Sequence, residues 1–291
     1  MLDRKKFFEA YKVQEAFNDS GLSWNVLDAI YNDYEERRLD LKEAADELQN
    51  IISEEMQFTV HSIHNRCKDP EHLIEKIIRK VGIEKRQKYK GINKDNYLTI
   101  VRDLIGFRIL TLSKEEWYRV HQFLIGLHKN DQYDIIMAEV PRAYIRYGDR
   151  DIFNNMIHKE YTNKGYRSQH YIVKYKQYYC EIQVRTIAEE VYGEFDHFVK
   201  YPYRENNHFL HRYTSVVAEL LNSVDEIIST CFQFGEEGWS DVEKYFKTDS
   251  YSDWSLIAKD SQDVFKHKIP EIENGEIDAK DYMNQMFLRR G

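Results

Sequence analysis

The apolar run LIGFRILTL at residues 104–112 is the sequence feature that most restricts the fold of this chain. Its nearly continuous apolar character and its β-branched residues are typical of a central strand in a sheet. Amphipathic patterns with helical spacing lie on either side of it, at residues 70–80 and 114–129. The run therefore predicts a sheet with helices packed against it.

The order of the remaining patterns predicts a mixed α/β fold. Short strands are expected at AYIRY (143–147), HYIVKY (170–175) and YYCEIQVRT (178–186), and helices at residues 1–58, 188–201 and 208–234. We expect an α/β (α+β) sheet of about five strands flanked by helices, with helical extensions at both ends. The expected division is an N-terminal helical extension at 1–58, a central domain at 59–205, and a C-terminal helical extension with a polar tail at 206–291.

The charge and cysteine content argue against several classes of protein. A formal net charge of −8 does not favour a general nucleic-acid binder, so any basic site must be local. The three cysteines include no CxxC pair, which argues against a disulfide framework or structural zinc and fits a reducing cytoplasm. The charged N-terminus does not resemble a signal peptide, and no apolar run approaches the roughly 18 residues of a membrane span. We expect a cytoplasmic protein with no membrane partner.

The segment EIQVRT at residues 181–186 combines an apolar face with a polar one. Strand alternation directs its two aliphatic side chains to one face, and its acid, amide and cation to the other. The three polar residues are Glu181, Gln183 and Arg185. An ordinary solvent-facing strand surface or a structural Glu–Arg pair would give the same pattern, so alternation alone leaves their role open.

Two charged residues accompany the apolar run. Asp103 directly precedes it, where a carboxylate can hold a divalent cation or simply serve a turn. Arg108 lies inside the run and needs a carboxylate or a phosphate as its partner. The sequence has neither a GxxxxGK[ST] nor a GxGxxG motif, so side-chain cations and a metal ion would have to bind any phosphate.

The segment NKGYRSQH at residues 163–170 places an aromatic ring among cations. Gly165 permits a turn or a close backbone approach, and Tyr166 offers a flat ring. Lys164 and Arg167 add charge beside that ring, which suits a purine nucleotide, and His170 begins the next strand. A hairpin turn with solvated side chains is the alternative interpretation.

A local basic stretch extends from residue 66 to residue 94. It could hold a polyphosphate or an RNA backbone, or it could be a solvated helix and loop. Its members are Arg66, Lys68, Lys76, Arg79, Lys80, Lys85, Arg86, Lys88, Lys90 and Lys94.

Four segments in order resemble the synthetase domain of the RelA/SpoT family, especially the single-domain small alarmone synthetases. They are NRCKDPEHLIEKI, RDLIGFRI, KGYRSQH and EIQVRTIAEEVYGEFDH, and they span about residues 60–202. The resemblance implies a nucleotidyltransferase-like sheet. It also implies an enzyme that transfers the β,γ-pyrophosphate of ATP to the 3′-hydroxyl of GDP or GTP, with Mg²⁺ as cofactor, to make the alarmone (p)ppGpp.

The same resemblance assigns roles to individual residues. Asp103 and Glu181 match the catalytic carboxylates, and both are expected magnesium ligands. The residues that match the ATP-binding cations are Arg66, Lys68, Lys76 and Arg108. The residues that match the acceptor-binding positions are Lys164, Tyr166, His170, Gln183 and Arg185, with Tyr166 stacking on the guanine.

Two further hypotheses remain open. The KYPY sequence at residues 200–203 resembles a toxic subgroup of the family, whose members modify the 3′ CCA end of tRNA or make adenine alarmones. The cations that would hold a tRNA are Lys80, Lys85, Arg86, Lys88 and Lys90. A binding module without catalysis is the third hypothesis, against which the intact Asp103 and Glu181 argue.

The resemblance also bears on partners and domains. It implies a homo-oligomer and an antitoxin or other regulatory protein as partners. The segment GDRDIFNNMIHKEYT at residues 148–162 is longer than in the compact synthetases. The 58 or so residues upstream are too short for the family's hydrolase domain, so we do not expect alarmone hydrolysis.

Overall fold

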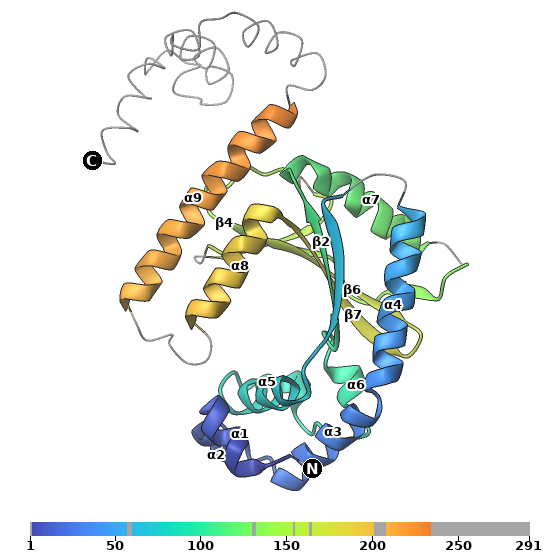
Figure 1. Cartoon of the computed structure of the whole chain (residues 1–291), viewed down its shortest axis with the longest axis vertical. Helices are drawn as coiled ribbons and strands as arrows, with labels where there is room; N and C mark the ends of the chain where they lie inside the picture. The colour runs from blue at the N-terminus through green and yellow to red at the C-terminus, as the bar shows by residue number, and fades with distance from the viewer. Residues whose placement is uncertain are drawn as a thin grey trace, which may run out of the picture. The chain divides into compact units, whose positions relative to one another are not determined.

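The structure of the protein, a computed structural model, describes residues 2–56, 60–129, 132–153, 155–162, 165–200 and 208–233. In this part of the chain, a seven-stranded mixed sheet carries helices on both faces (Figure 1). The strands are β1 (Ser62–Cys67), β2 (Ile105–Thr111), β3 (Ile135–Met137), β4 (Arg142–Arg146), β5 (His158–Thr162), β6 (Ser168–Tyr175) and β7 (Tyr178–Thr186). The α-helices are α1 (Arg4–Tyr11), α2 (Gln14–Ser20), α3 (Trp24–Glu36), α4 (Arg38–Glu55), α5 (Pro70–Gly82), α6 (Tyr97–Ile100), α7 (Trp117–His128), α8 (Ile187–Lys200) and α9 (His208–Gln233). Two short 3₁₀ turns are η1 (Gln87–Tyr89) and η2 (Lys114–Glu116).

The strand order is β1-β2-β7-β6-β4-β5, with β3 also paired to β6. β2 pairs in parallel with β7 and β4 with β5, whereas the other pairs are antiparallel. The mixed α/β prediction is confirmed, and strands β2, β4, β6 and β7 lie where the sequence placed them. β1, β3 and β5 were not predicted, because they are short or carry mainly polar side chains.

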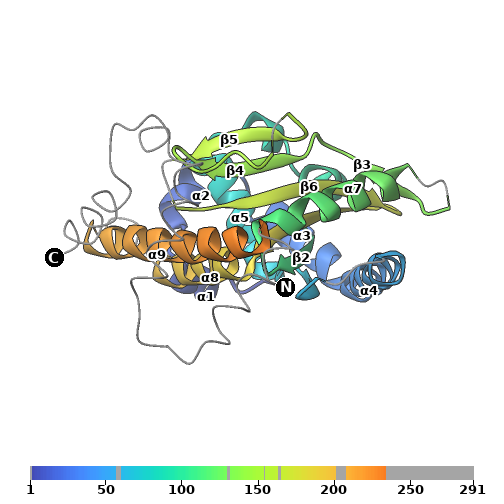
Figure 2. The same cartoon turned by 90° about the horizontal axis from the view of Figure 1, so that it is seen from above.

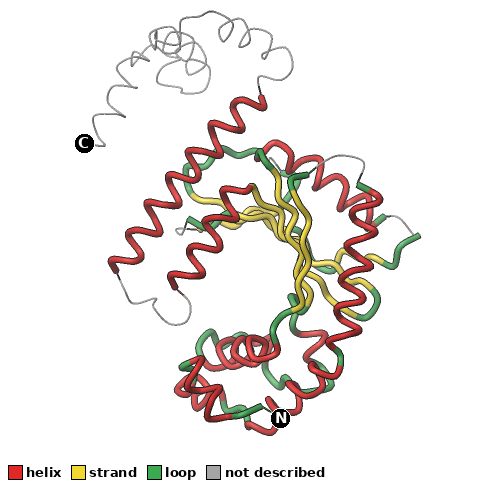
Figure 3. Tube along the Cα trace, in the orientation of Figure 1, coloured by secondary structure: helices red, strands yellow, loops and turns green. Residues whose placement is uncertain are grey.

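Different helices cover the two faces of the sheet. Helices α4 and α7 lie on one side of the strands, and α8 lies on the other (Figures 1 and 3). Trp117 of α7 donates a hydrogen bond to the hydroxyl of Tyr171 on β6, whereas Arg108 of β2 contacts Glu190 of α8. Alternate strand residues therefore enter an apolar layer under α7 and a polar layer under α8.

The helices predicted for residues 1–58 are present as α1 to α4. Their buried side chains join those of the sheet in one hydrophobic core, which includes Leu27 and Leu48 together with Phe107 and Val184. The N-terminal helices therefore share one hydrophobic core with the sheet.

Helix α5 confirms the prediction for residues 70–80 and begins at a well-formed cap. Asp69 accepts hydrogen bonds from the backbone N–H groups of Glu71 and His72 at 2.9 and 3.1 Å. Pro70 fills the first turn, where a missing N–H leaves no bond unmade. The aliphatic stripe of the helix is fully buried and consists of Leu73, Ile74, Ile77 and Ile78.

The end of α5 lies directly against α2. A Cβ atom on Gly82 would be 2.0 Å from the backbone carbonyl oxygen of Ala16, which cannot turn aside. The two helices can pack this closely only because Gly82 has no side chain.

Helix α9 runs beside α8 (Figures 1 and 2), and its buried face is mostly small or polar. The buried residues of this face are Thr214, Ala218, Asp225 and Ser229. Many of its large apolar side chains are exposed instead, namely Phe209, Tyr213, Val216, Leu220, Val224, Ile227 and Phe232. A Cβ atom on Gly165 would lie 2.2 Å from the Cβ of Ala218, so this glycine serves a close approach, as the sequence suggested.

Charged groups connect α9 to the ends of β2 and β7. Lys114 of η2 donates hydrogen bonds to Asn222 and Glu226, both at 2.8 Å. Thr186 at the end of β7 donates to Asp225 at 2.7 Å. Burial raises the pKa of Asp225 to about 7, and the negative charge of Glu189 adds to this effect.

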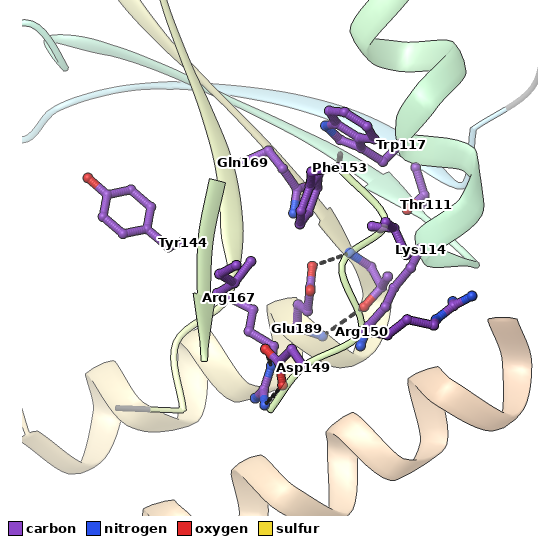
Figure 4. Close-up of a pocket in the computed structure, with 13 residues that line it drawn as sticks. Thr111, Lys114, Trp117, Tyr144, Asp149, Arg150, Phe153, Arg167, Gln169 and Glu189 are labelled. Atoms are coloured by element: carbon purple, nitrogen blue, oxygen red, sulfur yellow. Dashed lines mark hydrogen bonds and ion pairs between the residues drawn. The ribbon is translucent and has the colours of Figure 1, made fainter. Parts of the chain in front are cut away.

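A pocket on the α7 face adjoins this connection and is shown in Figure 4. The buried Arg167 donates to both carboxylate oxygens of Asp149 at 2.7 Å, and Lys114 and Glu189 lie nearby in the same view. The charge of Arg167 is thus satisfied inside the protein, so this residue does not act as a free cation beside the ring of Tyr166.

The three cysteines are free thiols in the structure. Cys67 of β1 and Cys180 of β7 flank Ile105 of β2 from opposite sides. Cys231 is exposed on α9. Within the described ranges, no helix has both the length and the apolar composition needed to cross a membrane.

The contact between α2 and α5 predicts opposite effects at two helical glycines. Gly82→Ala should lower the free energy of unfolding by about 1–3 kcal/mol, because its methyl group overlaps the backbone of Ala16. Gly126→Ala in α7 is the control, since a Cβ there meets nothing within 4 Å, and it should raise stability by up to about 1 kcal/mol. Urea unfolding measures both changes, and equal stability of the two variants would contradict this packing.

The raised pKa of Asp225 predicts a pH-dependent stability term. Its unfolded-state pKa is about 3.9, so the folded state holds the proton more tightly. The contribution is fully present below about pH 4 and is lost as the pH rises through 7. Asp225→Asn should remove this loss, and the variant should gain up to about 4 kcal/mol relative to the natural chain between pH 4 and 8. Parallel stability curves from urea unfolding would show that Asp225 carries no such term.

Candidate active site

The polar residues of EIQVRT line the face of the sheet beneath α8. The strand register puts Arg66 of β1, Gly106 of β2 and Glu181 of β7 in one row across the sheet. A second row on the same face of the sheet consists of Arg108 of β2, Gln183 of β7 and His170 of β6. The strand pairing therefore brings together residues from four of the sequence segments.

Asp103 lies just before β2, between two lysines supplied by the region of α5. Its carboxylate is 3.0 Å from Nζ of Lys68 and 2.5 Å from Nζ of Lys76, and all three side chains are less than one-fifth exposed. Burial alone would raise the pKa of Asp103, but the two ammonium groups hold it well below its usual range. Asp103 is therefore ionised and compensated by two of the predicted ATP-binding cations.

Glu181 is held at both of its carboxylate oxygens. His170 Nδ1 lies 3.1 Å from Oε1, and the amide of Gln183 donates to Oε2 at 2.7 Å. Burial alone would raise the pKa of Glu181, but His170 lowers it below the usual value. The charge of Asp103 acts in the opposite direction on Glu181, which places the two predicted catalytic carboxylates in one electrostatic environment.

Tyr166 is fixed by its hydroxyl. Arg185 Nη2 donates to this oxygen at 2.5 Å, and Nε2 of His170 lies 2.9 Å from it. All of these contacts are satisfied when Tyr166 donates to Nε2 and the Nδ1–H of His170 donates to Glu181. A hydrogen-bonded series thus runs from Arg185 to Glu181.

Arg185 is buried and has a polar partner for each nitrogen. Nε donates to Ser168 at 3.0 Å, and Nη1 donates to Glu190 at 2.9 Å. A Cβ atom on Gly193 of α8 would lie 2.5 Å from Nη1, so the glycine makes room for the guanidinium. Arg185 is held rigidly in place by strand β6 and helix α8.

Arg108 finds the carboxylate partners that its place in an apolar strand requires. It donates through Nη1 to Glu190 and, at 2.5 Å, to Glu194. The sequence reasoning did not single out either glutamate. Their spacing of four residues on the helix after EIQVRT puts both on one face, and this signal could have identified them.

The remaining predicted residues differ in their placement. Arg66 is exposed and lies in the same row across the sheet as Gly106 and Glu181, so it belongs to the same site. Lys164 lies outside the described residues. Gln183 turns its amide oxygen into the protein, where this atom has no hydrogen-bond partner among the described residues.

The basic stretch after α5 is less positive than its sequence suggests. Glu84 accepts from Lys80 at 2.7 Å, from Arg86 at 3.1 Å and from Arg79 at 2.6 Å. Lys85 donates to the carbonyl of Asp19, and Lys88 lies 3.7 Å from Glu139. Lys90 is exposed. Carboxylates therefore offset much of the predicted tRNA-binding charge.

The donor set of this face fits magnesium. Mg²⁺ is commonly held by one or two carboxylates and completes its coordination with water and substrate phosphates. Asp103 and Glu181 supply two such carboxylates. Among the described residues no group of three or more acidic, histidine or cysteine side chains is arranged for a metal ion, so phosphate would have to complete the site.

Comparisons with known proteins agree with this geometry. A family model described as the region found in RelA/SpoT proteins matches residues 65–206, which include Arg66, Asp103 and Glu181. No curated protein matches the chain in sequence.

Solved structures share the fold at low sequence identity. A GTP pyrophosphokinase family protein from Streptococcus pneumoniae is 20% identical, with a TM-score of 0.50, over 71% of this chain and 92% of its own. Small alarmone synthetase 1 from Bacillus subtilis is 21% identical, with a TM-score of 0.50, over 70% of this chain and 95% of its own. Its structure bound to AMPCPP is 18% identical, with a TM-score of 0.51, over 71% and 99%.

The order of the motifs, the shared fold and the family match lead to one conclusion. Residues 65–206 are a RelA/SpoT domain, and the protein is an enzyme of the pyrophosphotransferase class.

Proposed function

We propose that the enzyme transfers the β,γ-pyrophosphate of ATP to the 3′-hydroxyl of GDP or GTP and so makes (p)ppGpp. The pairing of β2 with β7 supports this proposal, because it brings the start of β2 beside Glu181. Asp103, just before β2, contacts Lys68 and Lys76, and Glu181 connects through His170 to Tyr166. Two nucleotides must be fixed together for in-line transfer, and this arrangement offers a separate set of contacts for each.

The cations on the donor side would hold the triphosphate of ATP. Lys68, Lys76 and Arg108 are anchored by carboxylates, and Arg66 is exposed beside them. Anchored cations lose little freedom when they take up phosphate oxygens, so they offset the charge that develops during transfer. The neighbour bound to AMPCPP supports a nucleotide donor of this kind.

The acceptor nucleotide would lie beside Tyr166 and Glu181. The hydroxyl of Tyr166 is fixed at one edge, which orients its ring for stacking on a guanine. Gln183 supports this side indirectly, because its amide N–H donates to Glu181 while its own amide oxygen is buried.

Glu181 is suited to receive the proton of the attacking hydroxyl. Its lowered pKa keeps it ionised at neutral pH, and His170 and Gln183 orient it. As O3′ bonds to the β-phosphorus, its proton passes to Glu181. The bond from the β-phosphorus to the α,β-bridging oxygen breaks, and AMP leaves.

Magnesium would supply positive charge to the phosphates at this site. Asp103 and Glu181 are the residues that would hold it. Asp103 already has Lys68 and Lys76 as cationic partners. A metal ion would share the Asp103 carboxylate with these lysines, and the ATP phosphates would bind the lysines.

Transfer to the 3′ CCA end of tRNA is the second candidate function. The exposed cations Lys85, Arg86, Lys88 and Lys90 support it. Glu84 and Glu139 offset part of this charge, so the proposal favours a free guanine nucleotide. Three expectations from the sequence stay predictions: an adenine nucleotide as acceptor, a homo-oligomer, and a regulatory protein as partner.

Removal of the carboxylate charges tests the proposed chemistry. Glu181→Gln and Asp103→Asn should each lower the rate of pyrophosphate transfer by at least about 10²-fold, because proton acceptance and metal binding both need an ionised carboxylate. Product formation from ATP and GDP in the presence of Mg²⁺ measures this rate.

Glu160→Gln is the matched control for these variants. Glu160 lies on the edge strand β5, pairs with Arg142, and should be replaceable with no loss of rate. Circular dichroism confirms that each variant is folded. A folded Glu181→Gln protein with the natural rate would refute the role given to this residue.

A further inference from the structure

Glu190 on the first turns of α8 contacts two arginines from different strands. Its Oε1 accepts from Arg108 of β2, and its Oε2 accepts from Arg185 of β7 at 2.9 Å. The side chain is only 14% exposed. Two guanidinium groups on one face of a sheet repel each other, and a shared carboxylate removes this repulsion.

The two arginines belong to opposite sides of the proposed reaction. Arg108 is among the donor-side cations. Arg185 holds the hydroxyl of Tyr166, which continues through His170 to the catalytic Glu181. Glu190 therefore connects Arg108 on the donor side to Arg185, which begins the hydrogen-bonded series on the acceptor side.

The packing of α8 keeps Glu190 in this position. Gly193 lets the helix approach Arg185 so closely that a Cβ atom would be 2.5 Å from the guanidinium. Glu194, one turn further along, contacts Arg108 and is 58% exposed. Arg108 thus has one buried and one exposed carboxylate partner, and the buried one is shared with Arg185.

We propose that Glu190 is a positioning residue that couples donor binding to acceptor binding. This inference rests on the proposed function. When ATP phosphates take over part of the bonding of Arg108, Glu190 is released to hold Arg185 more firmly. Arg185 in turn fixes Tyr166 and its partners in the arrangement that receives the acceptor.

Calorimetry on the full chain tests the coupling directly. AMPCPP has a methylene bridge between its α- and β-phosphorus atoms, so both nucleotides can bind without transfer. In the natural chain, saturating AMPCPP should tighten the affinity for GDP by about fivefold or more. In Glu190→Gln, AMPCPP should change the affinity for GDP by less than about twofold.

Glu194→Gln is the matched control, because Glu194 contacts Arg108 and not Arg185. It should change the affinity for AMPCPP but retain the tightening of GDP binding. If Glu190 had only a structural role, its replacement would lower stability or weaken the binding of both nucleotides. AMPCPP would still tighten the binding of GDP by the same factor as in the natural chain. Full coupling in folded Glu190→Gln would overturn the inference.

Gly193→Ala provides a second test that leaves Glu190 in place. Its methyl group would push Arg185 away from α8, while alanine favours the helix itself. The coupling should again fall below about twofold. If Glu190→Gln does not fold, full coupling in Gly193→Ala overturns the inference. If the natural chain makes no product from ATP and GDP, the proposed function has failed instead, and turnover assays separate the two cases.

Discussion

The parallel pairing of β2 with β7 is the constraint on which the site depends. It sets Gly106 opposite Glu181 and Arg108 opposite Gln183, so the polar alternation of one strand faces that of the other. The apolar residues of both strands then enter the core on the opposite face. A shift of this register by one residue would bury the charges and expose the aliphatic side chains.

Carboxylates compensate the cations of this face even without a nucleotide. Asp103 lies between Lys68 and Lys76, and Glu190 lies between Arg108 and Arg185. A half-buried cluster of cations alone would be unstable, because desolvation and mutual repulsion both oppose it. The same carboxylates hold the cations in place for an incoming polyphosphate. The stability of the fold and the proposed function therefore both require these carboxylates.

Periodicity predicted the elements that build the site but not all of its contacts. The buried stripe of α5 and the alternation of β7 depend on local patterns, so both could be read from the sequence. Strand β1, which carries Arg66, is polar and short, and only its pairing with β2 makes it a strand. Glu190 and Arg185 were hard to connect, because their contact depends on how α8 packs and on the room left by Gly193. The offset of Lys80 and Arg86 by Glu84 likewise depends on side-chain geometry.

Identification of the molecule that accepts the pyrophosphate tests the proposed function most directly. The natural chain would be incubated with Mg²⁺ and ATP labelled in its γ-phosphate, together with GDP, GTP, AMP or deacylated tRNA in separate reactions. We expect label in the guanine nucleotides, with AMP released from ATP in equal amount. Label in tRNA or AMP in place of GDP and GTP, or label in none of the four, would contradict the proposed function.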